Sequence, residues 1–161
     1  MRSKKIAIGD IHFPFVEKVS LEALYDHLSV EQQIAKICEI VQIGDMYDWF
    51  CASRFARTQD LYTPVEEIQL GREMVEDFWK TIKKICPKAK LKQIKGNHDE
   101  RPFKRIYDKV PELAGVIGRE WYDKLYGFPG VKVQDGSRDE LILDDVMFLH
   151  GYRKHGTHIF I

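Results

Sequence analysis

The spacing of apolar residues changes repeatedly between that of a strand and that of a helix over the first 95 residues. Short apolar runs bounded by polar or turn residues predict three buried strands, at residues 4–9, 39–44 and 90–95. Between them, apolar residues recur at every third or fourth position, which predicts helices over 19–37, with a break near Ser29, and over 64–85. This alternation predicts an α/β fold in which helices cover a parallel sheet.

The pattern changes after Gly127, where the apolar segments become shorter and turn residues separate them. Short strands are expected at 131–133, 141–143 and 146–149. Because Asp and Gly turns such as Asp135-Gly136 join them, we expect hairpins that form a second sheet. No linker, repeat or low-complexity segment divides the chain, so residues 1–161 are expected to form a single domain.

The composition is that of a globular protein without a charge bias. Of the 161 residues, 44% are apolar, and 25 Lys and Arg balance 25 Asp and Glu. The overall charge gives no sign of a nucleic-acid or membrane-surface partner, although it leaves room for a local basic groove. The apolar run at 6–8 is too short for a signal peptide or a membrane span, so we expect a cytoplasmic protein. Cys38, Cys51 and Cys86 are widely spaced, which favours buried packing over a disulfide or a metal site.

Polar side chains follow each of the three predicted parallel strands. Asp10, Asp45 and Asn97 lie just past the strand ends, and a glycine precedes each of them. Open α/β sheets collect their ligand-binding groups at this edge, and glycine lets the chain turn sharply there. We therefore expect the three strand ends to bring these side chains together.

The side chains at these positions have the chemistry of a metal site. Carboxylate, imidazole and amide donors suit Mn, Fe or Zn, whereas structural zinc would favour a set rich in thiolates, which is absent here. Two cations about 3.5–4 Å apart can clamp a phosphate and lower the pKa of a bridging water. Such a pair requires a bridging carboxylate and ligands from several strand ends.

Four motifs occur in a characteristic order along the chain: Asp10-x-His12, Gly44-Asp45-x-x-Asp48, Gly96-Asn97-His98-Asp99, and the single His150. In order and spacing they resemble the calcineurin-like metallophosphoesterases, a family that includes phosphoprotein phosphatases, cyclic-nucleotide phosphodiesterases and a repair nuclease. The resemblance covers nearly the whole chain. It implies an α/β/β/α sandwich of the metallophosphoesterase type.

The resemblance also implies two divalent metal ions, with Mn²⁺ expected and Fe or Zn as alternatives. It makes Asp10 and His12 ligands of the first ion and Asp45 the bridge between the two ions. Asn97 and His150 would hold the second ion.

By the same resemblance, His98 would contact the phosphate and protonate or stabilise the leaving oxygen, while Asp48 would orient its ring. Asp99, the acidic position of the third motif, is expected to cap the following helix. The implied reaction is hydrolysis of a phosphomonoester or phosphodiester by a hydroxide that the metals activate, with a nucleotide or nucleic acid favoured as substrate. The alternative is a non-catalytic metal-binding or interaction module on the same fold.

The chain departs from the family at its last motif, G-H-x-H, which supplies one histidine to each metal. His155-Gly156-Thr157-His158 has a different order, so these roles are not carried onto it. A flexible tail is the preferred interpretation, and a substitute ligand is the alternative. We therefore expect a domain that lacks its C-terminal part and has an incomplete second sheet, completed by a missing segment or by self-association.

Two sets of basic residues lie near the motifs. Arg101, Lys104 and Arg105 are expected to form a solvated helix face rather than to guide an anionic substrate. Arg54 and Arg57 lie among aromatic residues, and they could either line the phosphate side of a groove or pack in the ordinary way.

Overall fold

The computed structural model describes residues 3–55, 62–113, 124–133, 140–144 and 146–150. The predictions made for Arg57, for the Asp135-Gly136 turn and for His155 and His158 lie outside these residues.

A parallel sheet forms the centre of the molecule. Its strands are β1 (Ser3–Ile8), β2 (Lys36–Ile43), β3 (Lys90–Ile94) and β4 (Val131–Val133), in the spatial order β1-β2-β3-β4. Each neighbouring pair is parallel, which confirms the parallel sheet predicted from the alternation of strands and helices. The carboxyl ends of β1, β2 and β3 therefore lie along one edge of the sheet.

The prediction of a hairpin strand at 131–133 is wrong. β4 pairs in parallel with β3, with Leu91 opposite Val131 and Gln93 opposite Val133. Val131 and Val133 pack against the same core as the helices, which draws this short strand into the central sheet.

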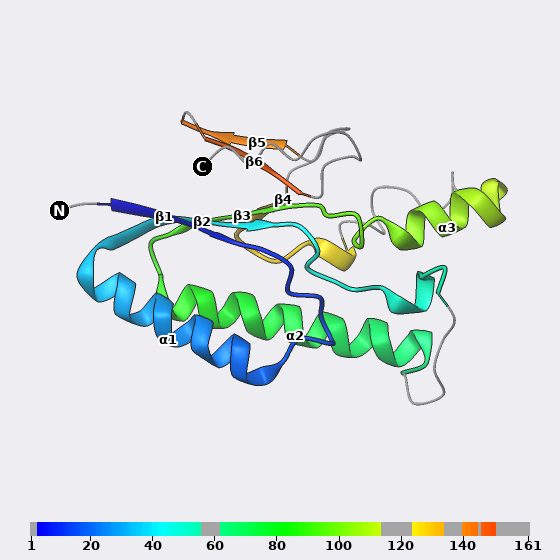
Figure 1. The fold of residues 1–161 in the computed structure, drawn as a ribbon, viewed down its shortest axis with the longest axis horizontal. Helices are drawn as coiled ribbons and strands as arrows, with labels where there is room; N and C mark the ends of the chain where they lie inside the picture. The colour runs from blue at the N-terminus through cyan, green and yellow to red at the C-terminus, as the bar shows by residue number, and fades with distance from the viewer. Residues whose placement is uncertain (1–2, 56–61, 114–123, 134–139, 145, 151–161) are drawn as a thin grey trace.

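Two long helices cover one face of the sheet (Figure 1). They are α1 (Lys18–Ile34) and α2 (Pro64–Ile85); a shorter helix, α3 (Arg101–Lys109), lies beyond the carboxyl end of β3. Short 3-10 helices occupy Phe50–Ala52 and Pro111–Leu113. Among the helices of the described residues, none combines the length and apolar character needed to cross a membrane.

The first helix differs from its predicted form in two ways. It is continuous at Ser29, whose hydroxyl donates to the carbonyl oxygen of Tyr25 one turn earlier (2.8 Å), a bond that a serine can make inside a helix. It also ends at Ile34, and Ile37 belongs to β2, where it is fully buried. The helical spacing of apolar residues continues past the end of the helix into the strand.

The second helix begins with a capping box. The Thr63 hydroxyl accepts the N–H of Glu66 (3.3 Å), and the Glu66 carboxylate accepts the N–H of Thr63 (2.8 Å). Pro64 follows at the first helical position, where its missing N–H costs no hydrogen bond, as the sequence predicts.

Replacing Thr63 with alanine is expected to lower the free energy of unfolding by about 1 kcal/mol, because the Glu66 N–H loses its acceptor. Urea denaturation would measure the change. Thr63→Ser keeps the hydroxyl and is expected to retain most of the stability. Equal midpoints for the alanine variant and the unmodified chain would show that the capping box contributes nothing.

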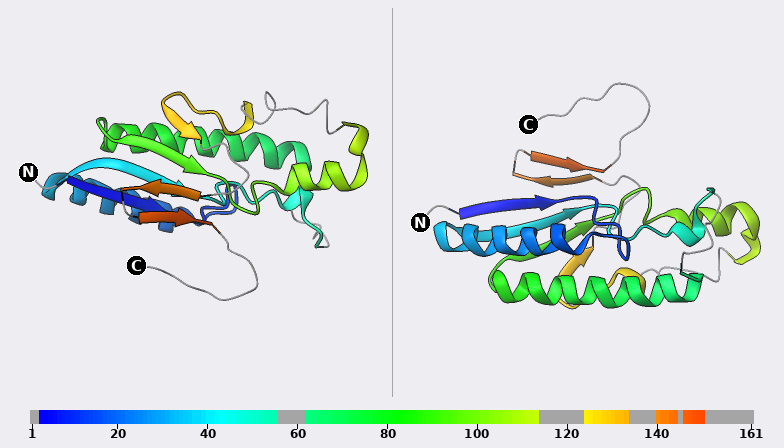
Figure 2. Two further views of the ribbon diagram at one scale, coloured as in Figure 1. Left: turned by 90° about the horizontal axis from the view of Figure 1, so that it is seen from above. Right: turned by 60° about the horizontal axis from the view of Figure 1, so that its bottom comes forward.

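A second, antiparallel sheet lies on the face opposite α1 and α2 (Figures 1 and 2). It consists of β5 (Glu140–Leu143) and β6 (Val146–Leu149), as the sequence predicts. Between the two sheets lies a small buried core of four residues, Val41, Ile94, Leu141 and Leu143. A larger core, which includes Ile40, Phe78 and Trp79, lies between the central sheet and the helices. The described residues thus form an α/β fold with a helical layer, a parallel sheet and a hairpin layer.

Candidate metal centre

The loops after β1 and β2 continue side by side beyond the sheet. The N–H of His12 donates to the carbonyl oxygen of Asp45 (2.9 Å), and the N–H of Phe13 donates to that of Met46 (2.9 Å). In return, the N–H of Asp48 donates to the carbonyl oxygen of Phe13 (3.0 Å). These backbone bonds fix the first two motifs next to each other, as expected for adjacent parallel strand ends.

Three residues of these loops have left-handed backbone conformations, which set the directions of their side chains. Asp10, His12 and Asp45 have φ angles of 49°, 57° and 52°, respectively. A non-glycine residue in this region is strained by about 1–3 kcal/mol, and such residues concentrate at functional sites. The strain is itself an observation in favour of a site at these loops.

Two glycines make room for the neighbouring side chains. A Cβ on Gly96 would lie 2.0 Å from Asp45 Oδ1 and 2.2 Å from the Asp45 backbone nitrogen. A Cβ on Gly44, whose φ is 99°, would lie 2.5 Å from Cγ of His150. The glycines that precede the second and third motifs are therefore required for the close approach of the loops.

Asp45 lies at the centre of the candidate site. Its carboxylate is buried, and Oδ2 lies 3.7 Å from Nε2 of His12 and 3.8 Å from Nε2 of His98. On its other side, the same oxygen lies 3.1 Å from Nε2 of His150. The second oxygen, Oδ1, accepts the backbone N–H of His98 (2.9 Å). One carboxylate thus faces three imidazoles from three different loops.

Among the described residues, two groups of side chains could each hold a metal ion, and Asp45 belongs to both. One group is His12, Asp45 and His98; the other is Asp10, Asp45 and His150. Within each group the ligand atoms lie within 4.8 Å of one another. Asn97 joins the second group, since its Oδ1 lies 3.2 Å from Nε2 of His150. We call Asp10, His12, Asp45, Asn97, His98 and His150 the Asp45 cluster.

The grouping differs in part from the ligand sets that the resemblance implies. Asp10 Oδ1 lies 3.9 Å from Nε2 of His12 and 4.0 Å from Nε2 of His150, so it borders both groups. His98 lies beside His12 at the first group, with the two ring centroids 4.5 Å apart. All the residues predicted as ligands or catalytic groups are therefore brought together at one edge of the sheet.

Asp48 lies behind the two histidines of the first group. One of its oxygens, Oδ2, is 3.2 Å from Nδ1 of His12 and 3.3 Å from Nδ1 of His98. Both Nδ1 atoms are buried, and neither makes a well-directed hydrogen bond. A carboxylate on this side favours a proton on Nδ1 and leaves the lone pair of Nε2 facing Asp45, as in histidines that bind metals.

His150 provides a test of whether a cation fits the second group. Its Nδ1 lies 2.8 Å from the carbonyl oxygen of Ile43, which can only accept, so Nδ1 donates. Its Nε2 then faces three oxygens, from Asp45, Asn97 and Asp10. Such a nitrogen needs a proton or a metal cation on that side. Without a metal, the hydrogen bond with Asp45 raises the pKa of His150 to about 9.

The electrostatics of the cluster favour ionised carboxylates. Burial raises the pKa of Asp45, but hydrogen bonds from His150 and from the His98 N–H outweigh it and bring the pKa below its usual value. The pKa of Asp48 is also lowered, because nearby His12, His98 and Arg101 outweigh the effect of burial. A buried carboxylate and a half-buried one beside imidazoles suit a divalent cation, and the residues present therefore fit the expected metals.

The two histidines of the first group have opposite pKa shifts. The nearby Asp48 carboxylate raises the pKa of His12. Burial lowers the pKa of His98, and the charge of Arg101 lowers it further, against the attraction of Asp45. His98 is thus the imidazole of this pair that is more readily neutral.

The prediction that Asp99 caps the following helix is wrong. Its side chain is fully buried and accepts three backbone N–H groups, from Gly96 (2.8 Å), Tyr47 (3.0 Å) and Met46 (3.4 Å). The N-cap position of α3 is Glu100, which makes no side-chain cap. Burial raises the pKa of Asp99 to about 7, even though the three N–H groups favour the charged form. Through these bonds, the Asp99 side chain connects the backbone of the second motif to that of the third.

Arg101 was expected on a solvated helix face, but it contacts the site. Its Nη1 donates to the carbonyl oxygen of Asp48 (2.9 Å) and to Oδ1 of Asp48 (3.1 Å). Its Nη2 lies 2.7 Å from Nε2 of His98. A side chain at the first position of a helix can reach back over the preceding loop, and the three-residue spacing from His98 was the signal in the sequence.

Lys104 and Arg105 agree with the prediction of a solvated helix face. Lys104 is exposed and pairs with Glu100 one turn earlier (2.5 Å), and Arg105 is also exposed. The guanidinium carbon of Arg54 lies 5.4 Å from the centre of the Phe55 ring. Both side chains are exposed, so this contact does not decide between the two alternatives for Arg54.

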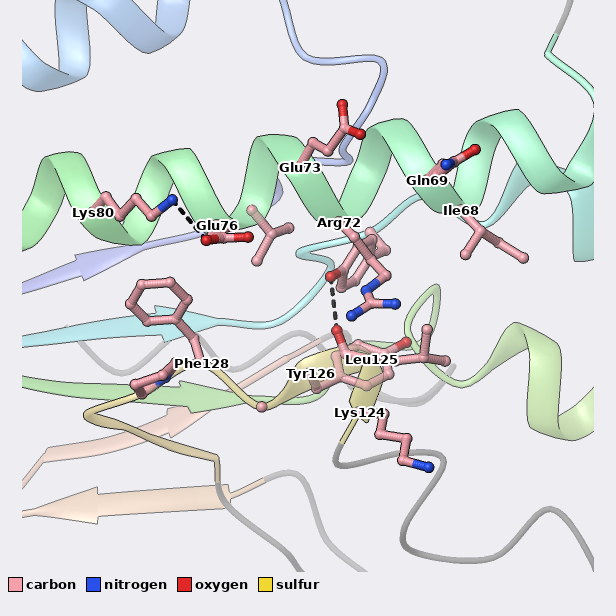
Figure 3. Close-up of a pocket in the computed structure, with 14 residues that line it drawn as sticks. Ile68, Gln69, Arg72, Glu73, Glu76, Lys80, Lys124, Leu125, Tyr126 and Phe128 are labelled. Atoms are coloured by element: carbon pink, nitrogen blue, oxygen red, sulfur yellow. Dashed lines mark hydrogen bonds and ion pairs between the residues drawn. The ribbon is translucent and has the colours of Figure 1, made fainter.

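A groove of about 530 Å³ lies apart from the Asp45 cluster, between α2 and residues 124–129 (Figure 3). Arg72 and Lys80 of α2 line it from one side, and Phe128 lines it from the other. Among the described residues, neither of the two metal-binding groups includes a side chain that lines this groove. The chemistry of the site is therefore assigned to the Asp45 cluster rather than to this groove.

Hydrogen bonds connect the short helical segment 124–126 to the loops of the cluster. The Tyr47 hydroxyl donates to the carbonyl oxygen of Leu125 (2.8 Å). The Trp49 indole donates to the Tyr126 hydroxyl (2.6 Å), which donates to the carbonyl oxygen of Asp99 (2.6 Å). The segment supports the second and third motifs from the helical side of the sheet, a connection that the sequence pattern does not reveal.

Comparison of the chain with models of protein families, with curated proteins and with solved structures gave no match.

Proposed function

We propose that this protein is a metal-dependent phosphoester hydrolase of the calcineurin-like type. The observation that carries the proposal is the position of Asp45, a buried carboxylate shared by two groups of potential metal ligands. Two-metal hydrolases need such a bridge, and the parallel strand ends supply ligands on both sides of it. The helical layer, parallel sheet and hairpin layer are compatible with three layers of the α/β/β/α sandwich of this family.

The residues that would hold the metals follow from the geometry. His12 and Asp45 would bind one ion, and His150 and Asn97 would complete the other side of Asp45. Asp10 can serve either ion, since it lies at nearly equal distances from His12 and His150. Mixed nitrogen and oxygen donors suit Mn²⁺, Fe and Zn alike, and we propose Mn²⁺ with Fe or Zn as alternatives.

Bound divalent cations would activate water and neutralise negative charge on a phosphate. The chain's own contribution is to hold the ligands in place and to position His98. Asp48 keeps a proton on the far side of the His98 ring, so that Nε2 faces the Asp45 carboxylate. In the proposed reaction His98 takes up a second proton on Nε2 and donates it to the leaving oxygen, while the Asp48 carboxylate beside Nδ1 stabilises the imidazolium form.

We propose phosphomonoesters or phosphodiesters as substrates and favour nucleotides or nucleic acid. The cluster is open on one side, because the Asp10 side chain is 64% exposed and Asn97 is exposed as well. An open cluster can admit a phosphate group within a long polymer. A cytoplasmic location is part of the proposal; among the described residues Cys38, Cys51 and Cys86 are not joined in disulfides, which suits a reducing compartment.

The proposal predicts Mn²⁺ binding and Mn²⁺-dependent hydrolysis of p-nitrophenyl phosphate or bis-p-nitrophenyl phosphate. Calorimetry would measure metal binding, and release of p-nitrophenol would measure turnover. His98→Ala is expected to lower the turnover about 100-fold or more while leaving metal binding largely intact, because the change removes a proton-transfer group.

The outcomes separate the two functional hypotheses. A chain that binds no metal and cleaves neither ester would contradict the proposed function. A chain that binds Mn²⁺ but cleaves neither ester would instead support a non-catalytic metal-binding or interaction module. An unchanged rate for His98→Ala would exclude His98 from the reaction.

A further inference from the structure

Arg101 links α3 to the edge of the Asp45 cluster through its guanidinium group. Nη1 bonds both the backbone and the carboxylate of Asp48, and Nη2 bonds Nε2 of His98. The side chain is 20% exposed, so the charged group is mostly withdrawn from solvent. A cation in this position is held by two residues that the proposed reaction uses.

The contact with His98 fixes the direction of the hydrogen bond. A guanidinium can only donate, so Nε2 of His98 must accept, and the ring proton lies on Nδ1, next to Asp48. The same Nε2 lies 3.8 Å from Oδ2 of Asp45. In the neutral form of His98, Arg101 therefore donates to the ring nitrogen that faces Asp45.

The guanidinium has donors beyond those that hold it in place. Arginine carries five N–H groups in a planar fork, and the three contacts with Asp48 and His98 use three of them. The remaining donors can bind an oxygen next to His98. A planar fork suits phosphate oxygens, because it can offer parallel hydrogen bonds together with a full positive charge.

The carboxylates at the site make a nearby positive charge useful for binding an anion. Asp10 and Asp45 of the cluster, together with Asp48 beside it, would repel a phosphate, and a fixed cation next to them reduces that repulsion in addition to any bound metals. Lys104 is a poorer candidate, since it is exposed and pairs with Glu100. Arg101 is withdrawn from solvent and already directed toward the site.

We propose that Arg101 binds a non-bridging oxygen of the substrate phosphate and at the same time positions His98. This inference rests on the proposed phosphoesterase function and deepens it by naming a residue that recognises the phosphate. The competing explanation is that Arg101 only ties α3 to the loop that carries Asp48.

Inorganic phosphate is the probe that separates these explanations without turnover. Calorimetry would first measure Mn²⁺ binding to the whole chain and then phosphate binding to the Mn²⁺-loaded protein. Arg101→Ala is expected to weaken phosphate binding about 10-fold or more, as for loss of a charged hydrogen bond, and to leave Mn²⁺ affinity within about threefold. Arg101→Lys keeps the charge without the fork and is expected to fall in between. Lys104→Ala, on the same helix, is expected to bind phosphate like the unmodified chain.

The possible results are distinct. Unchanged phosphate affinity in the Arg101 variants, with Mn²⁺ bound, would overturn the inference while leaving the proposed function intact. A lower thermal midpoint with unchanged phosphate affinity would assign Arg101 a structural role alone and would also overturn it. If Arg101→Ala does not fold, the lysine variant decides, because only a phosphate contact predicts weaker phosphate binding in a folded protein with normal Mn²⁺ affinity. Failure of the unmodified chain to bind Mn²⁺ would remove the proposed function and this inference with it.

Discussion

Replacing Asp45 with asparagine is expected to abolish binding at both metal positions and, with it, phosphoester hydrolysis. Asp45 belongs to both ligand groups, and its Oδ2 faces His12, His98 and His150. Asparagine preserves the size of the side chain and an acceptor for the His98 N–H, but it removes the negative charge that two cations would share. We expect Mn²⁺ affinity to fall on the order of 100-fold or more, with calorimetry as the measurement.

Asp10→Asn is the matched control for this substitution. Asp10 is a carboxylate at the exposed side of the cluster, and its ligand group is only one of the two. Its loss is expected to weaken one metal position and to leave the other measurable. Wild-type binding of two Mn²⁺ ions by the Asp45→Asn variant would contradict the central role given to this carboxylate.

The elements with strong periodicity could be predicted from the sequence. The three strands that precede the glycines and the long helix after Pro64 follow local patterns of apolar residues, and the structure has them. The end of α1 could not be found in this way, because Ile34 and Ile37 keep helical spacing although the chain has already entered β2. The partner of β4 was also hidden, since the alternation in Val131–Val133 suits either a hairpin or a parallel edge strand.

The candidate site could also be predicted only in part from the sequence. Asp10, Asp45 and Asn97 follow parallel strand ends, and parallel pairing was enough to expect them at one edge. His150 follows β6 of the antiparallel hairpin, and its place in the site was expected from the family resemblance alone. Asp99 and Arg101 were misassigned because each bonds to residues about fifty positions earlier, Tyr47 and Asp48 respectively. Local sequence offered each of them a plausible helical role, and only the tertiary arrangement excludes it.

The new assignment of Asp99 leads to the largest expected effect on stability. Asp99→Ala removes the acceptor of three backbone N–H groups, those of Gly96, Tyr47 and Met46. A buried N–H without a partner costs about 1–3 kcal/mol, and the long bond from Met46 falls at the low end of that range. We expect the free energy of unfolding to fall by about 3–5 kcal/mol, which urea denaturation would measure.

Two further variants make this prediction specific to the hydrogen bonds. Asp108→Ala removes an exposed carboxylate from α3 and is expected to change stability by about 0.5 kcal/mol or less. Asp99→Asn keeps one carbonyl oxygen but turns an NH₂ group toward a buried N–H, so its loss of stability should lie between those of the two alanine variants. If Asp99→Ala were as stable as Asp108→Ala, the backbone of the second and third motifs would be held by the Tyr126 and Trp49 contacts without the Asp99 carboxylate. Met46 directly follows Asp45 in the chain, and Gly96 packs against Asp45, so a large loss would show that the stability of the fold and the geometry of the cluster depend on one buried side chain.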